Sequence, residues 1–95
     1  MVEMNFCCEA MKLAGINCEY KNDSLIEINN ISIHIIGSLA QFGTYKFRFS
    51  DVYDFLCALD QSGLLFLSIN DKHKIKDCYN RLISLATSKA KVTKI

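Results

Sequence analysis

The pattern of apolar and polar positions begins with a helix-like segment at residues 3–14. Apolar side chains recur there at the i, i+3, i+4 and i+7 spacing of one helix face, and Gly15 follows as a natural stop. The stripe consists of Met4, Cys7, Cys8 and Met11, widened by Phe6, Ala10 and Leu13. Because this apolar arc is wide, we expect the helix to be well buried.

The clearest local signal lies in residues 24–36, which read S-L-I-E-I-N-N-I-S-I-H-I-I. Asparagine tolerates positive φ, so Asn29 and Asn30 are expected to form a two-residue hairpin turn. In that register one face is apolar throughout, and a slip of one residue would destroy the match. The apolar face consists of Ile26, Ile28, Ile31, Ile33 and Ile35, and the opposite face of Glu27, Ser32 and His34.

Alternation returns in residues 44–49, T-Y-K-F-R-F, and predicts a further antiparallel strand. Residues 18–20 are expected to add a short edge strand. Residues 37–43 are interpreted as a loop or an irregular extension of a strand.

Two helices are predicted in the C-terminal half. Ser50 is the expected N-cap of the first, which ends at Gly63. The second is expected over residues 71–87. Between them, residues 64–69 form an apolar run that is too short for periodicity to distinguish a buried strand from a continuation into a helix.

Together these elements predict an α+β domain. We expect a three- to four-stranded antiparallel meander sheet, with an N-terminal helix and two C-terminal helices packed on one face. A chain of 95 residues fits a single globular domain, residues 1–95, with residues 88–95 as a basic tail that can fray. Apolar residues make up 51% of the chain, so some apolar surface is expected to meet a partner, for which a homodimer is one candidate.

The cysteines are the most conspicuous candidates for chemistry. There are five, an odd number without framework spacing, so we expect free thiols in a reducing cytoplasm. Cys7 and Cys8 are adjacent, and neighbouring helical side chains diverge by about 100°, so they are poorly placed to chelate one ion. The two histidines have no partner at ligand spacing. We therefore expect no metal site, and interpret the pair as small, soft core residues.

Other functional motifs are missing from the sequence. No nucleophile elbow, phosphate-binding loop, dinucleotide fingerprint or metal-binding helix occurs, and the carboxylates are scattered. We expect no catalytic residues, no cofactor and no enzymatic activity. No apolar run approaches the roughly 20 residues that a membrane span needs, so membrane contact is not expected.

Charge is distributed unevenly along the chain. Residues 1–62 carry a net charge of −4, whereas residues 63–95 carry +5. Basic side chains are therefore the candidates for contact with a partner, although those of the last helix can equally be its solvated face. The candidates are Lys72, Lys74, Lys76 and Arg81 in the last helix, and Lys46 and Arg48 on the open face of the sheet.

These features favour a small, non-catalytic protein that acts through a protein–protein interface. Isoleucine, lysine and asparagine supply 27 of the 95 residues, which is typical of an AT-rich genome. An accessory protein of a phage or mobile element that inhibits a host macromolecular complex has this general character. The alternative is a nucleic-acid-binding protein that uses the basic C-terminal helix. The third hypothesis is a small cysteine- or metal-dependent protein.

Overall fold

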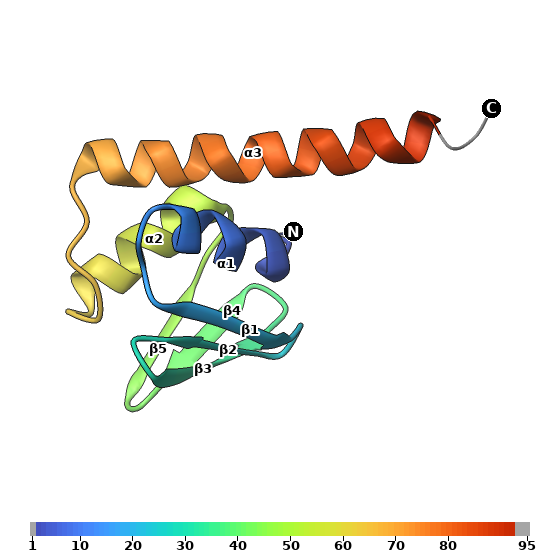
Figure 1. The fold of residues 1–95 in the computed structure, drawn as a ribbon. Coiled ribbons are helices and arrows are strands. Elements are labelled where there is room, and N and C mark those ends of the chain that lie inside the picture. The colour runs from blue at the N-terminus through green and yellow to red at the C-terminus, as the bar shows by residue number, and fades with distance from the viewer. Residues whose placement is uncertain (1, 93–95) are drawn as a thin grey trace.

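The computed structural model describes residues 2–92 and shows an antiparallel sheet with all three helices on one of its faces (Figure 1). Each strand pairs with the next along the chain, in the order β1-β2-β3-β4-β5. The elements are α1 (Met4–Leu13), β1 (Cys18–Asn22), β2 (Leu25–Ile28), β3 (Ile31–Ile36), β4 (Leu39–Phe42), β5 (Tyr45–Arg48), α2 (Val52–Gln61) and α3 (Ile69–Val92). The predicted α+β class is thereby confirmed.

Tight turns join all the strands, and each connection is two residues long. Asn29 and Asn30 have φ values of 52° and 66°, which is the left-handed geometry that their hairpin requires. Ile28 lies opposite Ile31 in the resulting ladder, as the hydrophobic pattern predicted. The short turns make each strand fold back on the previous one, which produces a meander.

The sheet has one strand more than expected. Residues 37–43, interpreted from the sequence as a loop or an irregular extension, contain strand β4 between two glycine-containing turns. Ala40 and Phe42 are buried on the helix side, while Leu39 and Gln41 point to the open face. β1 is the predicted edge strand and extends two residues further, to Asn22.

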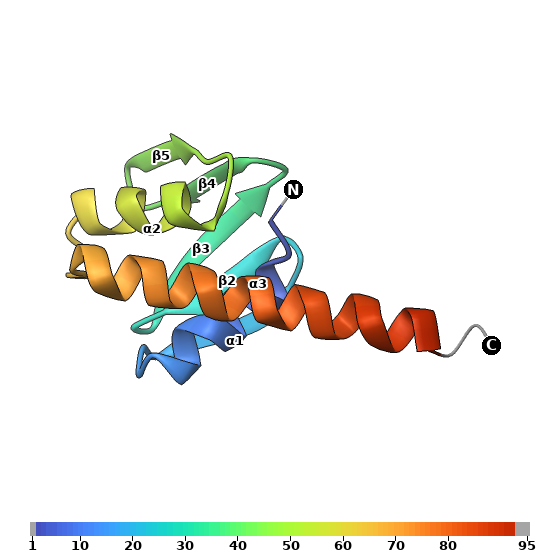
Figure 2. The same ribbon diagram turned by 90° about the horizontal axis from the view of Figure 1, so that it is seen from above.

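Helices α1 and α2 form the layer directly above the sheet. α1 lies beside β1, whereas α2 covers the other half of the sheet, near β4 and β5 (Figure 2). Phe55 of α2 is fully buried, and its ring centroid lies 4.9 Å from that of Phe49 and 5.8 Å from that of Phe47. The apolar faces of sheet and helices thus enclose one continuous core.

The N-cap of α2 differs from the prediction by one residue. Asp51, not Ser50, caps the helix, because its carboxylate accepts a hydrogen bond of 2.8 Å from the backbone N–H of Asp54. Ser50 instead donates its backbone N–H to the Asp54 carboxylate at 2.9 Å. The two aspartates therefore both satisfy backbone donors at this helix start.

Helix α3 forms a third layer across α1 and α2 (Figures 1 and 2). It runs from Ile69 to Val92 and so exceeds the predicted residues 71–87 at both ends. For residues 64–69 the sequence left strand and helix open. Residues 64–68 form neither and are an irregular connection, and Ile69 begins α3. None of the helices in the described part of the chain has the length and apolarity to cross a membrane.

Candidate interaction surface

The predicted basic residues of α3 divide between two sides of the helix. Lys72 and Lys76 face α2, where the Lys72 Nζ lies 2.9 Å from an Asp60 carboxylate oxygen and the Lys76 Nζ lies 4.0 Å from one of Asp51. Only 11% of the Lys72 side chain is exposed, and its hydrogen bond with Asp60 raises its pKa. Lys72 thus links α3 to α2, whereas the longer and more exposed contact of Lys76 contributes little.

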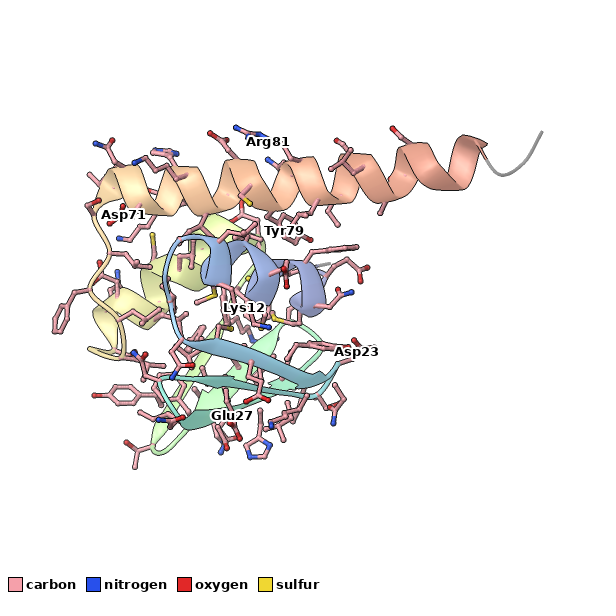
Figure 3. The ribbon with its side chains drawn as sticks, viewed as in Figure 1. Lys12, Asp23, Glu27, Asp71, Tyr79 and Arg81 are labelled. Atoms are coloured by element: carbon pink, nitrogen blue, oxygen red, sulfur yellow. The ribbon has the colours of Figure 1, made fainter. Side chains whose placement is uncertain are left out.

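Lys74 and Arg81 lie on the outer side of α3. They are seven residues apart, which places them on the same side of the helix, and both are exposed. Arg81 points away from the body, whereas Tyr79 points down towards α1 (Figure 3). Of the predicted positions on α3, these two are the most exposed, although the Lys76 side chain is still 40% exposed beside Asp51.

The other two predicted residues lie on the far side of the molecule. Lys46 and Arg48 belong to β5 and project from the open face of the sheet, away from the helices. Glu27 of β2 marks the same face in Figure 3. The structure therefore does not bring the six predicted residues together into one surface.

An exposed apolar cluster at one end of the sheet escaped the sequence analysis. The two turns that precede Ile31 and Tyr45 meet the chain that leaves α2 there, around a pocket of about 470 Å³. Phe66, in the connection to α3, is 89% exposed, and Tyr45 is 51% exposed. Ile31, Tyr45 and Leu64 line this pocket above the buried Phe42, and Phe66 follows Leu64 by two residues along the connection. We call these five residues the apolar end.

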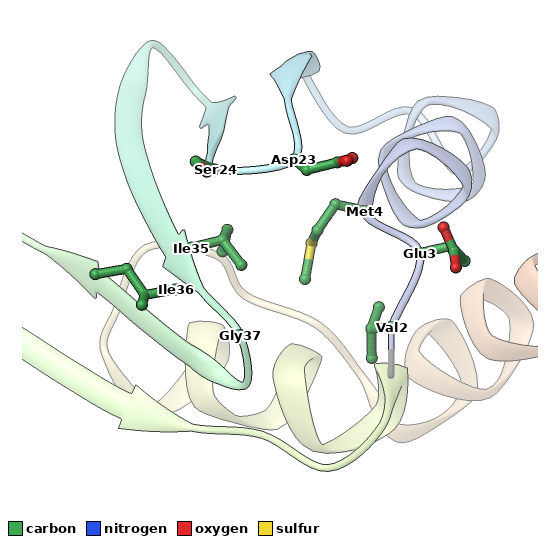
Figure 4. A pocket seen from close by; sticks show the side chains of 8 residues that line it. All are labelled: Val2, Glu3, Met4, Asp23, Ser24, Ile35, Ile36 and Gly37. Carbon is green, nitrogen blue, oxygen red and sulfur yellow. The ribbon is translucent and has the colours of Figure 1, made fainter.

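A second pocket, of about 460 Å³, lies where the N-terminal segment meets the turns of β1–β2 and β3–β4. Met4 points between Val2 and Ile35, and Glu3 and Asp23 are the acidic residues of the lining (Figure 4). No cysteine or histidine lines it. Its polar side chains are the Ser24 hydroxyl and the carboxylates of Glu3 and Asp23.

The cysteines near the N-terminus are part of the core. Cys7 and Cys8 are 0% and 1% exposed, and Cys18 of β1 is 3% exposed. Burial raises the pKa of Cys7 to about 12. The thiol of Cys8 is hydrogen-bonded to Cys18, and this bond, followed by burial, raises the pKa of Cys8. The same bond lowers the pKa of Cys18. Cys7 and Cys8 thus stay protonated and are poor nucleophiles, and all three side chains are packed in the core.

Within the residues that the structure describes, no group of three or more histidine, cysteine, aspartate or glutamate side chains is arranged to hold a metal ion. Comparison of the chain with protein-family models, with curated proteins and with solved structures gives no match. The fold thus defines a small α+β domain. The exposed surfaces of this domain are the basis for the function proposed below.

Proposed function

We propose that this protein is a non-catalytic binding module that acts through a protein–protein interface centred on the apolar end. The observation that carries the proposal is the exposure of Phe66, since an aromatic side chain at 89% exposure gains nothing from the fold of its own chain. Covering such a side chain contributes roughly 1.5–3 kcal/mol to binding. Clustered exposed apolar residues often mark interaction sites.

The surroundings of Phe66 also fit this role. Tyr45 combines a large apolar ring with a hydroxyl group and belongs to the residue types that are enriched at binding hot spots. The pocket beside it, about 470 Å³, offers space for a side chain of the partner. Ile69, 65% exposed at the start of α3, is a further exposed apolar side chain three residues after Phe66, and Lys74 is an exposed basic residue of the same helix. A partner with an apolar centre and acidic rim would match this surface.

Inhibition of a host macromolecular complex is the mode of action that we favour for this module. A domain with a preformed apolar surface can occlude a site on a larger assembly without catalysing a reaction. Inhibition of this kind is stoichiometric, so its titration reaches a plateau at a fixed molar ratio. An enzyme would instead act at substoichiometric amounts.

Nucleic-acid binding through α3 is less well supported. Lys72 and Lys76 are engaged with Asp60 and Asp51, and the acidic Asp77 shares the exposed side of the helix with Arg81. Binding dominated by phosphate contacts weakens steeply with salt. An electrophoretic mobility shift with a generic duplex and a single strand at low ionic strength, followed by a salt titration, would reveal this activity.

Affinity capture with matched variants tests the proposal. The tagged chain, the variant Phe66→Asp and the control Ser32→Asp are used as baits in lysate of the source cells, and the retained proteins are quantified by mass spectrometry. Ser32 is exposed on the open face of the sheet, so its variant adds the same charge elsewhere. We expect a partner that Phe66→Asp loses and Ser32→Asp retains. Equal capture by both variants would exclude the apolar end as the binding site.

A further inference from the structure

Helix α3 is longer than the layer that supports it. Near the start of α1, the backbone N–H of Glu3 donates a hydrogen bond of 2.9 Å to the Tyr79 hydroxyl. From Tyr79, α3 continues to Val92, which is about 20 Å of helix. This half of α3 projects beyond α1 and α2 (Figures 1 and 2). We call residues 80–92 the overhang.

The underside of the overhang is apolar. Its residues Leu82, Ile83, Leu85 and Ala86 all lie within about 80° of the direction in which the buried Ile75 points. Leu85 is 59% exposed, and the other three are half-buried. An amphipathic helix in a folded protein derives most of its stability from packing of its apolar face. Within the described chain Leu82 packs partly against the core, whereas Leu85 is left largely uncovered.

A groove adjoins this apolar face. It has a volume of about 550 Å³ and lies between the start of α1 and the overhang. Phe6 forms its α1 side, and Ile83 and Ala86 belong to its α3 side. An apolar helix face and a groove that can receive such a face therefore lie next to each other in one molecule. A twofold interface between identical chains requires this arrangement, because each chain contributes the same surface.

The distribution of charge also favours a second copy of this chain as the partner. From residue 78 onwards the chain has no carboxylate side chain, and it has four basic residues. Glu3 and Glu9 are exposed, three residues on either side of Phe6, and neither forms an ion pair with another described side chain. The C-terminal sequence and the start of α1 therefore carry charges of opposite sign.

We propose that the overhang and this groove form the interface of a symmetric homodimer. The two α3 helices run antiparallel, with Ala86 near the twofold axis, where a small side chain allows close approach. Each overhang covers the groove of the other copy, and the positive net charge of the sequence after residue 77 favours its approach to the α1 glutamates of that copy. Phe66 precedes the opposite end of α3, so the dimer leaves both apolar ends free for other proteins.

Sedimentation equilibrium of the full chain over a wide concentration range tests this proposal without any other partner. The wild type is expected to dimerise, and Ala86→Glu to remain monomeric while keeping its helical circular dichroism. The matched control is Ser84→Glu, which adds the same charge on the outer side of the same turn and should still dimerise. The interface is refuted by a wild type that is monomeric throughout, or by the two variants associating equally.

A second variant covers the case that Ala86→Glu fails to fold. Reversing both charges in the double variant Glu3→Lys and Glu9→Lys should weaken the dimer, and raised salt should weaken the wild-type dimer through screening. Dimerisation that neither the double variant nor salt affects would overturn the charge-complementary arrangement. Loss of partner capture by Phe66→Asp is independent of these results, so the binding proposal and the dimer can fail separately.

Discussion

Helices α1 and α3 are both amphipathic, but they relate to the rest of the protein in different ways. The apolar stripe of α1 is almost completely buried between the sheet and α3, with Cys7 and Met11 at 0% exposure. Among the described side chains of α3, Ile75 is the single one that is buried, and Lys72 contacts α2 through an ion pair. Helix α1 therefore contributes mainly to the hydrophobic core, whereas α3 leaves most of its surface available for contact with other molecules.

The largest difference between inner and outer positions is expected for two phenylalanines. Phe55→Ala removes a ring that is fully buried against Phe47 and Phe49, so it should lower the free energy of unfolding by about 3–5 kcal/mol. Phe66→Ala removes a ring that is 89% exposed and should change it by no more than about 0.5 kcal/mol. Urea unfolding, followed by circular dichroism, measures both. Similar losses at the two positions would contradict the assignment of Phe66 to a binding surface.

Serine substitutions at the two cysteines of α1 should lower the free energy of unfolding by different amounts. Cys7→Ser places a hydroxyl in the apolar core and should cost about 1–3 kcal/mol of unfolding free energy. Cys8→Ser should cost less, because the new hydroxyl can still hydrogen-bond to Cys18. Cys78→Ser in α3 is the control, since this side chain is half-buried. Thermal and urea unfolding give the order, and a larger loss at Cys8 than at Cys7 would reject it.

The buried thiol of Cys7 predicts a loss of stability at alkaline pH. Its pKa is raised in the folded protein from 9.0 to about 12, so above pH 9 the unfolded chain releases a proton that the folded protein retains. Stability is therefore fully present below pH 9 and declines by about 1.4 kcal/mol per pH unit towards pH 12. Urea unfolding of wild type and Cys7→Ala across this range should show a shallower decline for the variant. Identical slopes would exclude this contribution.

The smallest effect on stability is expected on the outer side of α3. Lys74→Glu and Arg81→Glu alter exposed side chains and should change the free energy of unfolding by no more than about 0.5 kcal/mol. Lys72→Glu replaces the ion pair with Asp60 by two like charges and should lower the thermal midpoint more. Calorimetry of the three variants checks the order. If Lys72→Glu proves as neutral as the other two, α3 is not held to α2 by this pair.

The sequence was sufficient to predict those structural features that depend on residues close together along the chain. The β2–β3 hairpin followed from its isoleucine pattern and the Asn29–Asn30 turn, because both strands and the turn are contiguous. Strand β4 was missed, since four residues between glycine turns give too short an alternation and Ala40 contributes a weak apolar signal. Residues 64–68 remained open for a similar reason: Leu65 is buried and Phe66 is exposed, a difference set by contacts elsewhere in the chain.

The candidate surface was less predictable than the fold. The lysines of α3 could be recognised as a basic group, but their ion pairs depend on Asp60 and Asp51 of another helix. The apolar end brings together turns that are more than thirty residues apart at its extremes, such as those before Ile31 and Leu64. Such proximity follows from the meander topology and from the path of the chain after α2.

Site-specific photo-crosslinking tests the proposed binding surface most directly. Benzoylphenylalanine is introduced in place of Phe66, where the exposed side chain tolerates exchange, or in place of Ser32 on the open face of the sheet as a control. After irradiation in the source cells, we predict a discrete adduct with another protein from position 66 and none from position 32. An adduct from position 32 alone, or equal adducts from both, would contradict binding through the apolar end.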